Sequence, residues 1–198
     1  MPANATTIPK IMRNRQQGFS MMEVLIAVVV LTVGLLGGAA MQAQALSSNR
    51  DARLASVAVG LAREVGEMMR GNKNIAIDSN PGANPYLVAA TGTAPSVGVD
   101  CFSSSCANPV DLAKWQMADW ISRVMDALPG ARVAVCYDSS PFDASGTPQW
   151  ACSNSGGVAV VKIGWTKRTT AGDASTAAAF DRAATPSIVF PVLAGSTL

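Results

Sequence analysis

The chain has 198 residues, of which 49% are apolar and only 14% charged, so it is more apolar and less charged than an ordinary soluble domain. Its formal net charge is +2 and its basic residues form no cluster, which argues against a nucleic-acid-binding surface. It contains no His and none of the common catalytic or nucleotide-binding motifs. We therefore expect no enzymatic activity, no cofactor and no bound metal.

The N-terminal region joins a basic flank to a long apolar run. Residues 1–18 are polar and carry Lys10, Arg13 and Arg15 without any acidic residue, and residues 19–41 are apolar almost throughout. The run is long enough to cross the ~30 Å hydrocarbon core of a bilayer as a helix, with the basic flank on the cytoplasmic side. A secretory signal peptide has a shorter apolar stretch of roughly 7–15 residues. A plain membrane anchor would also fit the length.

One acidic residue, Glu23, lies inside the apolar run. A carboxylate in hydrocarbon costs on the order of a few kcal/mol, so it indicates a functional site with a partner. If the chain is cut between Gly18 and Phe19, Phe19 carries a free amine about one helical turn from Glu23. Such an amine and carboxylate can pair between neighbouring helices that are staggered along one axis.

The stretch from Gly18 to Glu23, GFSMME, together with the apolar run that follows, resembles the prepilin signature of the type IV pilin family. The resemblance implies that prepilin peptidase removes residues 1–18, that Phe19 is methylated and that Glu23 guides docking into a filament. It also implies that residues 19–41 serve first as membrane anchor and then as filament core, with a head of residues 42–198. The implied fold is α+β, a long N-terminal helix packed on an antiparallel sheet with a second, shorter helix.

Three glycines, Gly34, Gly37 and Gly38, interrupt the apolar run. Each costs helix propensity of up to about 1 kcal/mol relative to Ala. Gly34 and Gly38 form a GxxxG pair that permits close helix packing, and a locally loosened helix is an equally good reading. Many filament pilins have a Pro in this stretch and this chain has none, so we hypothesise that the glycines supply the flexibility.

Beyond the apolar run, periodicity and turn residues predict the remaining elements. The first helix continues to about residue 70 with an amphipathic pattern, and Asn108-Pro109 begins a second helix that ends at Pro129-Gly130. Residues 72–107 read as a loop with one short strand at 86–89. Strands are predicted at 132–137, 158–165 and 187–193, the last at a sheet edge because it contains Pro191, and residues 166–185 read as a long loop.

The four cysteines, Cys101, Cys106, Cys136 and Cys152, all follow the apolar segment. Three pairings are possible, and we prefer Cys101 with Cys106 and Cys136 with Cys152, since the second bond would clamp two strands. A four-cysteine zinc site is the alternative, although the spacing lacks the usual knuckles. The four Trp residues fit either core packing or a ligand platform.

Within the family, the second half resembles PilV-type minor pilins, although a type II secretion pseudopilin, a major pilin and a membrane-anchored periplasmic binding protein remain alternatives. The matching segments are Gly34–Gly37, the Cys101–Cys106 pair, the Trp120 helix ending at Leu128-Pro129-Gly130, Val135-Cys136, Trp150–Cys152 and Val160–Trp165. The resemblance implies a bacterial inner-membrane protein with a periplasmic head that later joins the surface pilus. Its implied partners are prepilin peptidase, the inner-membrane assembly platform, other minor pilins, the major pilin and a tip adhesin.

Overall fold

The computed structural model describes residues 18–98, 100–166 and 184–195. Its elements are α1 (Met21–Gly71), α2 (Lys73–Ala76), β1 (Val88–Thr91), α3 (Pro109–Ala127), β2 (Arg132–Tyr137), β3 (Ala159–Gly164) and β4 (Ile188–Val192). The chain divides into two compact units between Ser47 and Ser48, a boundary that falls within α1. We call residues 48–198 the head unit.

The strands of the head unit form one antiparallel sheet in the order β1-β2-β3-β4. The central pair β2 and β3 is in continuous register, with Val135 opposite Val161. Pro191 of β4 lies opposite Val160, and β4 is at the edge of the sheet, as its proline predicts. An edge position suits proline because it has no N–H to donate to a further strand.

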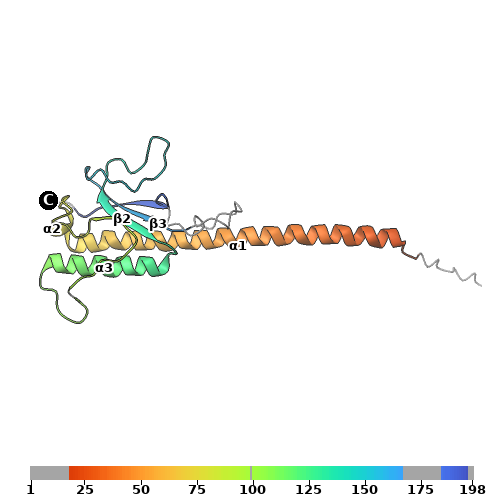
Figure 1. The fold of residues 1–198 in the computed structure, drawn as a ribbon, viewed down its shortest axis with the longest axis horizontal. Coiled ribbons are helices and arrows are strands. Elements are labelled where there is room, and N and C mark those ends of the chain that lie inside the picture. The colour runs from red at the N-terminus through yellow and green to blue at the C-terminus, as the bar shows by residue number, and fades with distance from the viewer. Residues whose placement is uncertain (1–17, 99, 167–183, 196–198) are drawn as a thin grey trace, which may run out of the picture. The chain divides into compact units, whose positions relative to one another are not determined.

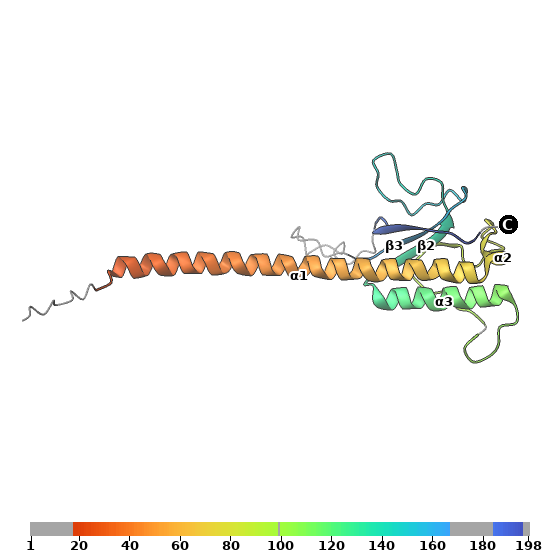
Figure 2. The same ribbon diagram turned by 180° about the vertical axis from the view of Figure 1, so that it is seen from behind.

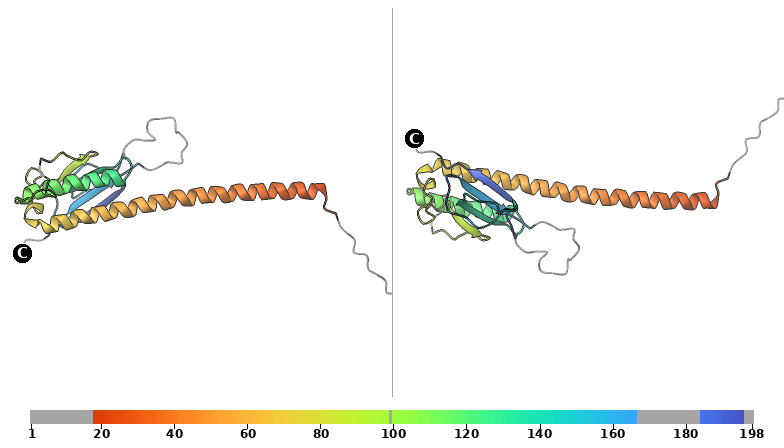
Figure 3. Two further views of the ribbon diagram at one scale, coloured as in Figure 1. Left: turned by 90° about the horizontal axis from the view of Figure 1, so that it is seen from below. Right: turned by 90° about the horizontal axis from the view of Figure 1, so that it is seen from above.

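Two helices cover one face of this sheet. The C-terminal part of α1 and the whole of α3 lie side by side against it (Figure 1; Figure 3). The Trp120 indole N–H donates a 2.9 Å hydrogen bond to the Leu61 carbonyl, and Arg123 pairs with Glu64 at 2.5 Å, so both contacts join α3 to α1. The buried core combines Val65 and Met69 of α1, Met117, Trp120, Ile121 and Val124 of α3, and Val133, Val135, Val161 and Ile163 of the sheet. The predicted α+β class with a pilin-like arrangement is confirmed.

The helix α3 begins and ends where the sequence predicts. The Asn108 side chain accepts a 2.9 Å hydrogen bond from the Val110 N–H, and Pro109 takes the first helical position, where its missing N–H costs nothing. Beyond its end, Gly130 adopts φ +60°, a left-handed conformation that favours glycine. This turn leads the chain directly into β2.

The segment between α1 and α3 is more ordered than the sequence predicts. It contains the four-residue helix α2, and its strand β1 begins at Val88 rather than at Tyr86. Tyr86 instead belongs to a turn, because its N–H bonds to the Asn84 side chain and its hydroxyl to Gln116. The predicted loop at 166–185 lies largely outside the described residues.

Candidate assembly site

The candidate cleavage junction directly precedes the start of α1. Gly18 and Phe19 come before the helix, and Ser20 caps it by accepting a 3.3 Å hydrogen bond from the Met22 N–H. The Glu23 N–H bonds to the Ser20 carbonyl at 3.0 Å, which closes the first helical turn. Glu23 therefore lies in the first turn, where a negative charge is favourable to the helix dipole.

Glu23 is exposed and borders a shallow, mainly apolar hollow on the surface of α1. The residues that line it recur along one helical face at steps of three and four residues. It is lined by Phe19, Glu23, Val24, Ala27, Val28 and Leu31. No cation among the described residues forms an ion pair with Glu23. The carboxylate is thus placed among apolar neighbours, one turn from the junction.

The first half of α1 exposes its apolar side chains. This stretch has a mean hydropathy of 2.6 over 18 residues, none of them buried, and α1 is the one described helix long and apolar enough to cross a membrane. Leu25, Leu31 and Leu36 are each more than 60% exposed. So large a continuous apolar surface requires lipid or other helices to cover it.

Gly34, Gly37 and Gly38, for which the sequence suggests a role in flexibility or packing, all lie inside α1, and the helix is continuous through them. A Cβ added at any of them would meet no atom within 4 Å. The surface around them is therefore open to a neighbouring helix. Their proposed part in flexibility or packing stays a prediction.

Residues 13–39 match the family model described as the prokaryotic N-terminal methylation motif. The motif supports a type IV pilin-like family. No curated protein and no solved structure matches the chain. The matched residues contain Gly18 and Phe19 of the predicted junction, Glu23 and the three glycines Gly34, Gly37 and Gly38.

The head unit carries two disulfides. Cys101 is bonded to Cys106 in the connection before α3, and Cys136 of β2 is bonded to Cys152. These are the two pairs that the sequence favours. Cys136, Asp138 and Cys152 bring potential metal-ligand atoms within 4.8 Å of one another, but both sulfurs are bonded in the disulfide and offer no thiolate.

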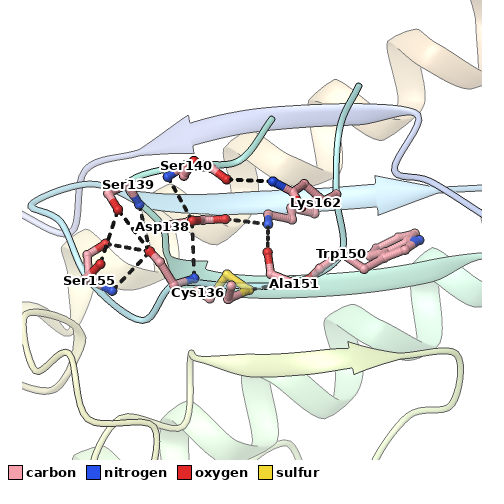
Figure 4. Close-up of polar contacts among 11 residues, drawn as sticks. Cys136, Asp138, Ser139, Ser140, Trp150, Ala151, Ser155 and Lys162 are labelled. Atoms are coloured by element: carbon pink, nitrogen blue, oxygen red, sulfur yellow. Dashed lines mark hydrogen bonds and ion pairs between the residues drawn. A yellow bond between two sulfur atoms is a disulfide. The ribbon is translucent and has the colours of Figure 1, made fainter. Parts of the chain in front are cut away.

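Residues 138–158 connect β2 to β3, and we call them the clamped loop because the second disulfide ties Cys152 within this connection to Cys136 of β2. The clamped loop folds over the face of the sheet opposite the helices (Figure 4). Lys162 of β3 is fully buried there and donates hydrogen bonds to Asp138 at 2.5 Å and to the Ala151 carbonyl at 2.6 Å. The N–H groups of Ser140 and Ser153 donate to the other oxygen of Asp138, at 3.0 and 3.3 Å. The carboxylate and the ammonium are thus both compensated.

The environment of Asp138 has two opposing effects on its pKa. Burial raises the pKa, while the bonds from Lys162, Ser140 and Ser153 lower it and outweigh the burial, so the pKa of Asp138 lies below its ordinary value. This pair was not predicted from the sequence. The available signal in the sequence is a single lysine, Lys162, within the otherwise apolar run of β3. A lysine in such a strand needs a buried partner.

The four Trp residues divide between core and surface. Trp120 and Trp165 are buried, at 0% and 2% exposure, which fits core packing. Trp115 and Trp150 are half-buried. The guanidinium of Arg132 lies 4.8 Å from the centre of the Trp150 ring, a cation–π contact that adds to the attachment of the clamped loop.

Proposed function

We propose that this protein is a minor pilin of a type IV pilus that helps to prime pilus assembly within the tip complex and supports the display of an adhesin. One observation carries the proposal: Glu23 lies in an exposed apolar helix, one turn from Phe19, and forms no ion pair with any residue that the structure describes. The methylation motif over residues 13–39 supports the same reading. Because no described residue of the same subunit pairs with Glu23, we infer that its partner belongs to another subunit.

In the proposed pathway, residues 1–18 form a leader that prepilin peptidase removes on the cytoplasmic face. Residues 19–41 hold the subunit in the inner membrane, with the head of residues 42–198 in the periplasm. The new amine at Phe19, once methylated, keeps its positive charge. It then pairs with the Glu23 carboxylate of an adjacent subunit when the apolar helices bundle into the filament core.

The energetics of this pairing favour one axial position. In a low-dielectric bundle an uncompensated carboxylate costs several kcal/mol, and an opposite charge relieves that cost only when it lies close by. Glu23 therefore selects the axial offset at which it meets a neighbouring amine. Because this subunit has the acid, we place it beneath another subunit rather than at the very end of the tip.

The head supports the minor-pilin assignment. The disulfides Cys101–Cys106 and Cys136–Cys152 occur in the order found in PilV-type proteins, whereas major pilins usually have one C-terminal disulfide loop. As partners we propose other minor pilins, the major pilin, prepilin peptidase and the inner-membrane assembly platform.

Mass spectrometry of the protein from its native membrane tests the N-terminal half of this proposal. The expected mature chain begins at methylated Phe19, and a chain that retains the residues before Phe19 would contradict the proposal and favour a membrane-anchored binding protein. Deletion and complementation of the gene test the rest. Loss of surface pili supports the minor pilin, whereas intact pili with a secretion defect identify a type II secretion pseudopilin, the alternative that shares the methylation motif.

A further inference from the structure

A pocket in the head unit lies where the edge of the sheet meets the clamped loop. It has a volume of about 360 Å3 and is lined mainly by apolar groups. Its lining comes from β1 and the residue before it, from β2 and from the clamped loop, and includes Leu87, Ala89, Val135, Trp150 and Cys152. We call it the Trp150 pocket. Ligand pockets span roughly 300–1,000 Å3, so its volume suits an apolar side chain rather than a large cofactor.

The wall that the clamped loop supplies to this pocket is held in place. Figure 2 shows the clamped loop, in teal, on the sheet side of the head unit, away from α3. Cys152 is bonded to Cys136 of β2, and the Ala151 carbonyl accepts a 2.6 Å hydrogen bond from Lys162. A wall that is fixed before binding loses little conformational entropy when a ligand is bound.

The pocket opens beside an edge of the sheet. The outermost strand there is β1, and its outer edge makes no backbone hydrogen bond to any segment that the structure describes. It contains no proline and no charged residue, whereas β4 at the other edge contains Pro191. A bulge between Val88 and Thr91 keeps pairing with a further strand short, so we expect the pocket to contribute more to binding than the edge. An extended peptide suits such a site, because its backbone can lie along β1 while one side chain enters the pocket.

A positive charge adjoins the pocket. The Arg132 guanidinium lies 4.8 Å from the centre of the Trp150 ring, and it forms no ion pair within the described ranges of the chain. Arg132 directly precedes Val133, which lies opposite Thr91, so the charge is placed toward the C-terminal end of β1. A bound segment that carries an acidic side chain at this end would be complementary in charge.

We propose that the Trp150 pocket binds an extended segment of another pilus subunit, in which a large apolar side chain fills the pocket and an acidic side chain pairs with Arg132. The inference rests on the proposed function, because assembly through α1 brings the heads of different subunits together. One extended segment buries less surface than the roughly 1,200 Å2 of a stable interface in solution. The contact therefore depends on the high local concentration that assembly provides.

A photoreactive phenylalanine derivative in place of Pro81 of the full chain, activated in cells, tests the proposal. Pro81 is exposed and lines the pocket, so a probe at this position is close to a bound segment. The expected product joins this chain to another pilus subunit through a peptide in which a large apolar residue lies within about two positions of Asp or Glu. The same derivative at Phe142, an exposed residue of the clamped loop outside the pocket lining, is the matched control and should not give this product.

An exchange of charges tests the pairing with Arg132. Arg132→Glu should lower the yield of the product about twofold to fivefold, because it replaces attraction by repulsion. Lysine in place of the partner's acidic residue should restore the yield in the Arg132→Glu strain. Since Arg132→Glu also removes the guanidinium from the Trp150 ring, a failure of this restoration means that the loss is structural, and it overturns the pairing.

Filling the pocket tests the other half of the contact. Ala89 is exposed and lines the pocket, so Ala89→Trp adds bulk there without disturbing the buried core. The yield should fall at least as far as in Arg132→Glu. An unchanged yield overturns the pocket as the binding site.

Mass spectrometry of Phe19 in the same samples separates this contact from the proposed function. If methylated Phe19 is found in pili but position 81 gives no product, the contact is overturned and the minor-pilin function stands. A product with a second copy of this chain, or with a peptide that has no acidic residue, overturns it in the same way. An unprocessed chain overturns the proposed function and the contact with it.

Discussion

At the scale of single residues, Glu23 offers the most direct test of assembly. Glu23→Gln keeps the shape of the side chain and removes its charge, so the amine of a neighbouring subunit is left uncompensated. Breaking a buried pair in this way typically costs about 3–5 kcal/mol, so we expect the pilus-bound fraction to fall by more than about tenfold while Phe19 is still processed. Immunoblots of sheared pili measure this fraction.

The matched control for Glu23 is Glu67→Gln. Glu67 lies on the same helix but within the head unit, where it pairs with Arg70 at the surface. Exposed pairs of this kind contribute little, so this variant should assemble normally. Equal defects in the two variants would contradict a specific part for Glu23.

The buried pair of Lys162 and Asp138 predicts a large effect on stability. Lys162→Met leaves the Asp138 carboxylate buried without its main partner, and we expect the free energy of unfolding to fall by about 3–5 kcal/mol. The double variant with Asp138→Asn should lose less, because no charge is then left unpaired. Urea unfolding of the full chain in detergent, with the disulfides intact, measures both, and a double variant worse than the single one would contradict the pairing.

The lowered pKa of Asp138 also predicts the sign of a pH effect. An unfolded Asp titrates near about pH 3.9, and the folded group titrates below that value, so its contribution to stability is complete above the unfolded pKa. The contribution is lost as the pH falls through the folded pKa. The wild-type protein should therefore lose stability more steeply below about pH 4 than the Asp138→Asn variant. Thermal unfolding at a series of pH values measures the difference, and parallel curves would contradict it.

At the scale of elements, the three glycines of α1 test the flexibility hypothesis. Replacing Gly34, Gly37 and Gly38 together by Ala adds up to about 1 kcal/mol of helix propensity at each position, and the structure offers no clash within one molecule. We expect the subunit to remain in the membrane but to enter pili poorly, because its helix can neither loosen nor pack closely against a neighbour. Unchanged assembly, measured by immunoblots of sheared pili, would reject the hypothesis.

The two disulfides should differ in their contribution. Opening the Cys136–Cys152 loop by replacing both residues with Ser should lower the free energy of unfolding by about 3 kcal/mol, and the same change at the shorter Cys101–Cys106 loop by about 2 kcal/mol. Denaturant unfolding of both double-serine variants gives the order. A larger loss for the Cys101–Cys106 variant would contradict the chain-entropy argument.

The sequence predicted the longer elements well because their signals are local. The β-branched run of β2 and the Asn108-Pro109 cap of α3 specify those elements without reference to the rest of the fold. The start of β1 was misplaced by two residues because it depends on where the partner strand is reached, at Val135. The helix α2 has only four residues, too few to show a period.

The same distinction applies to the sites. Gly18, Phe19 and Glu23 lie within six consecutive residues, so a local sequence motif is enough to predict them. Asp138 and Lys162 are separated by 24 positions and come together only when the clamped loop folds over the sheet. Their partnership depends on tertiary structure, and a lone lysine in an apolar strand indicates only that some partner exists.

At the scale of the whole molecule, the core and the apolar surface belong to different units. Every buried residue described lies at Ala58 or beyond, and residues 18–46 are exposed. A chain that begins at Ser48 should therefore fold cooperatively and remain in solution without detergent, whereas the full chain should sediment once detergent is removed. Ultracentrifugation and thermal unfolding check this, and aggregation of the shortened chain would show that the first half of α1 is needed for folding.

The clamped loop is held at its base by a covalent bond, a buried ion pair and the Arg132–Trp150 contact. Its tip is a separate local turn, in which Asp143 accepts hydrogen bonds from the N–H groups of Ser145 at 2.9 Å and Thr147 at 2.8 Å. Mutations at the tip therefore leave β2 and β3 undisturbed. Such a tip can accept changes of sequence without loss of folding, and it offers a place to graft a foreign epitope onto the molecule.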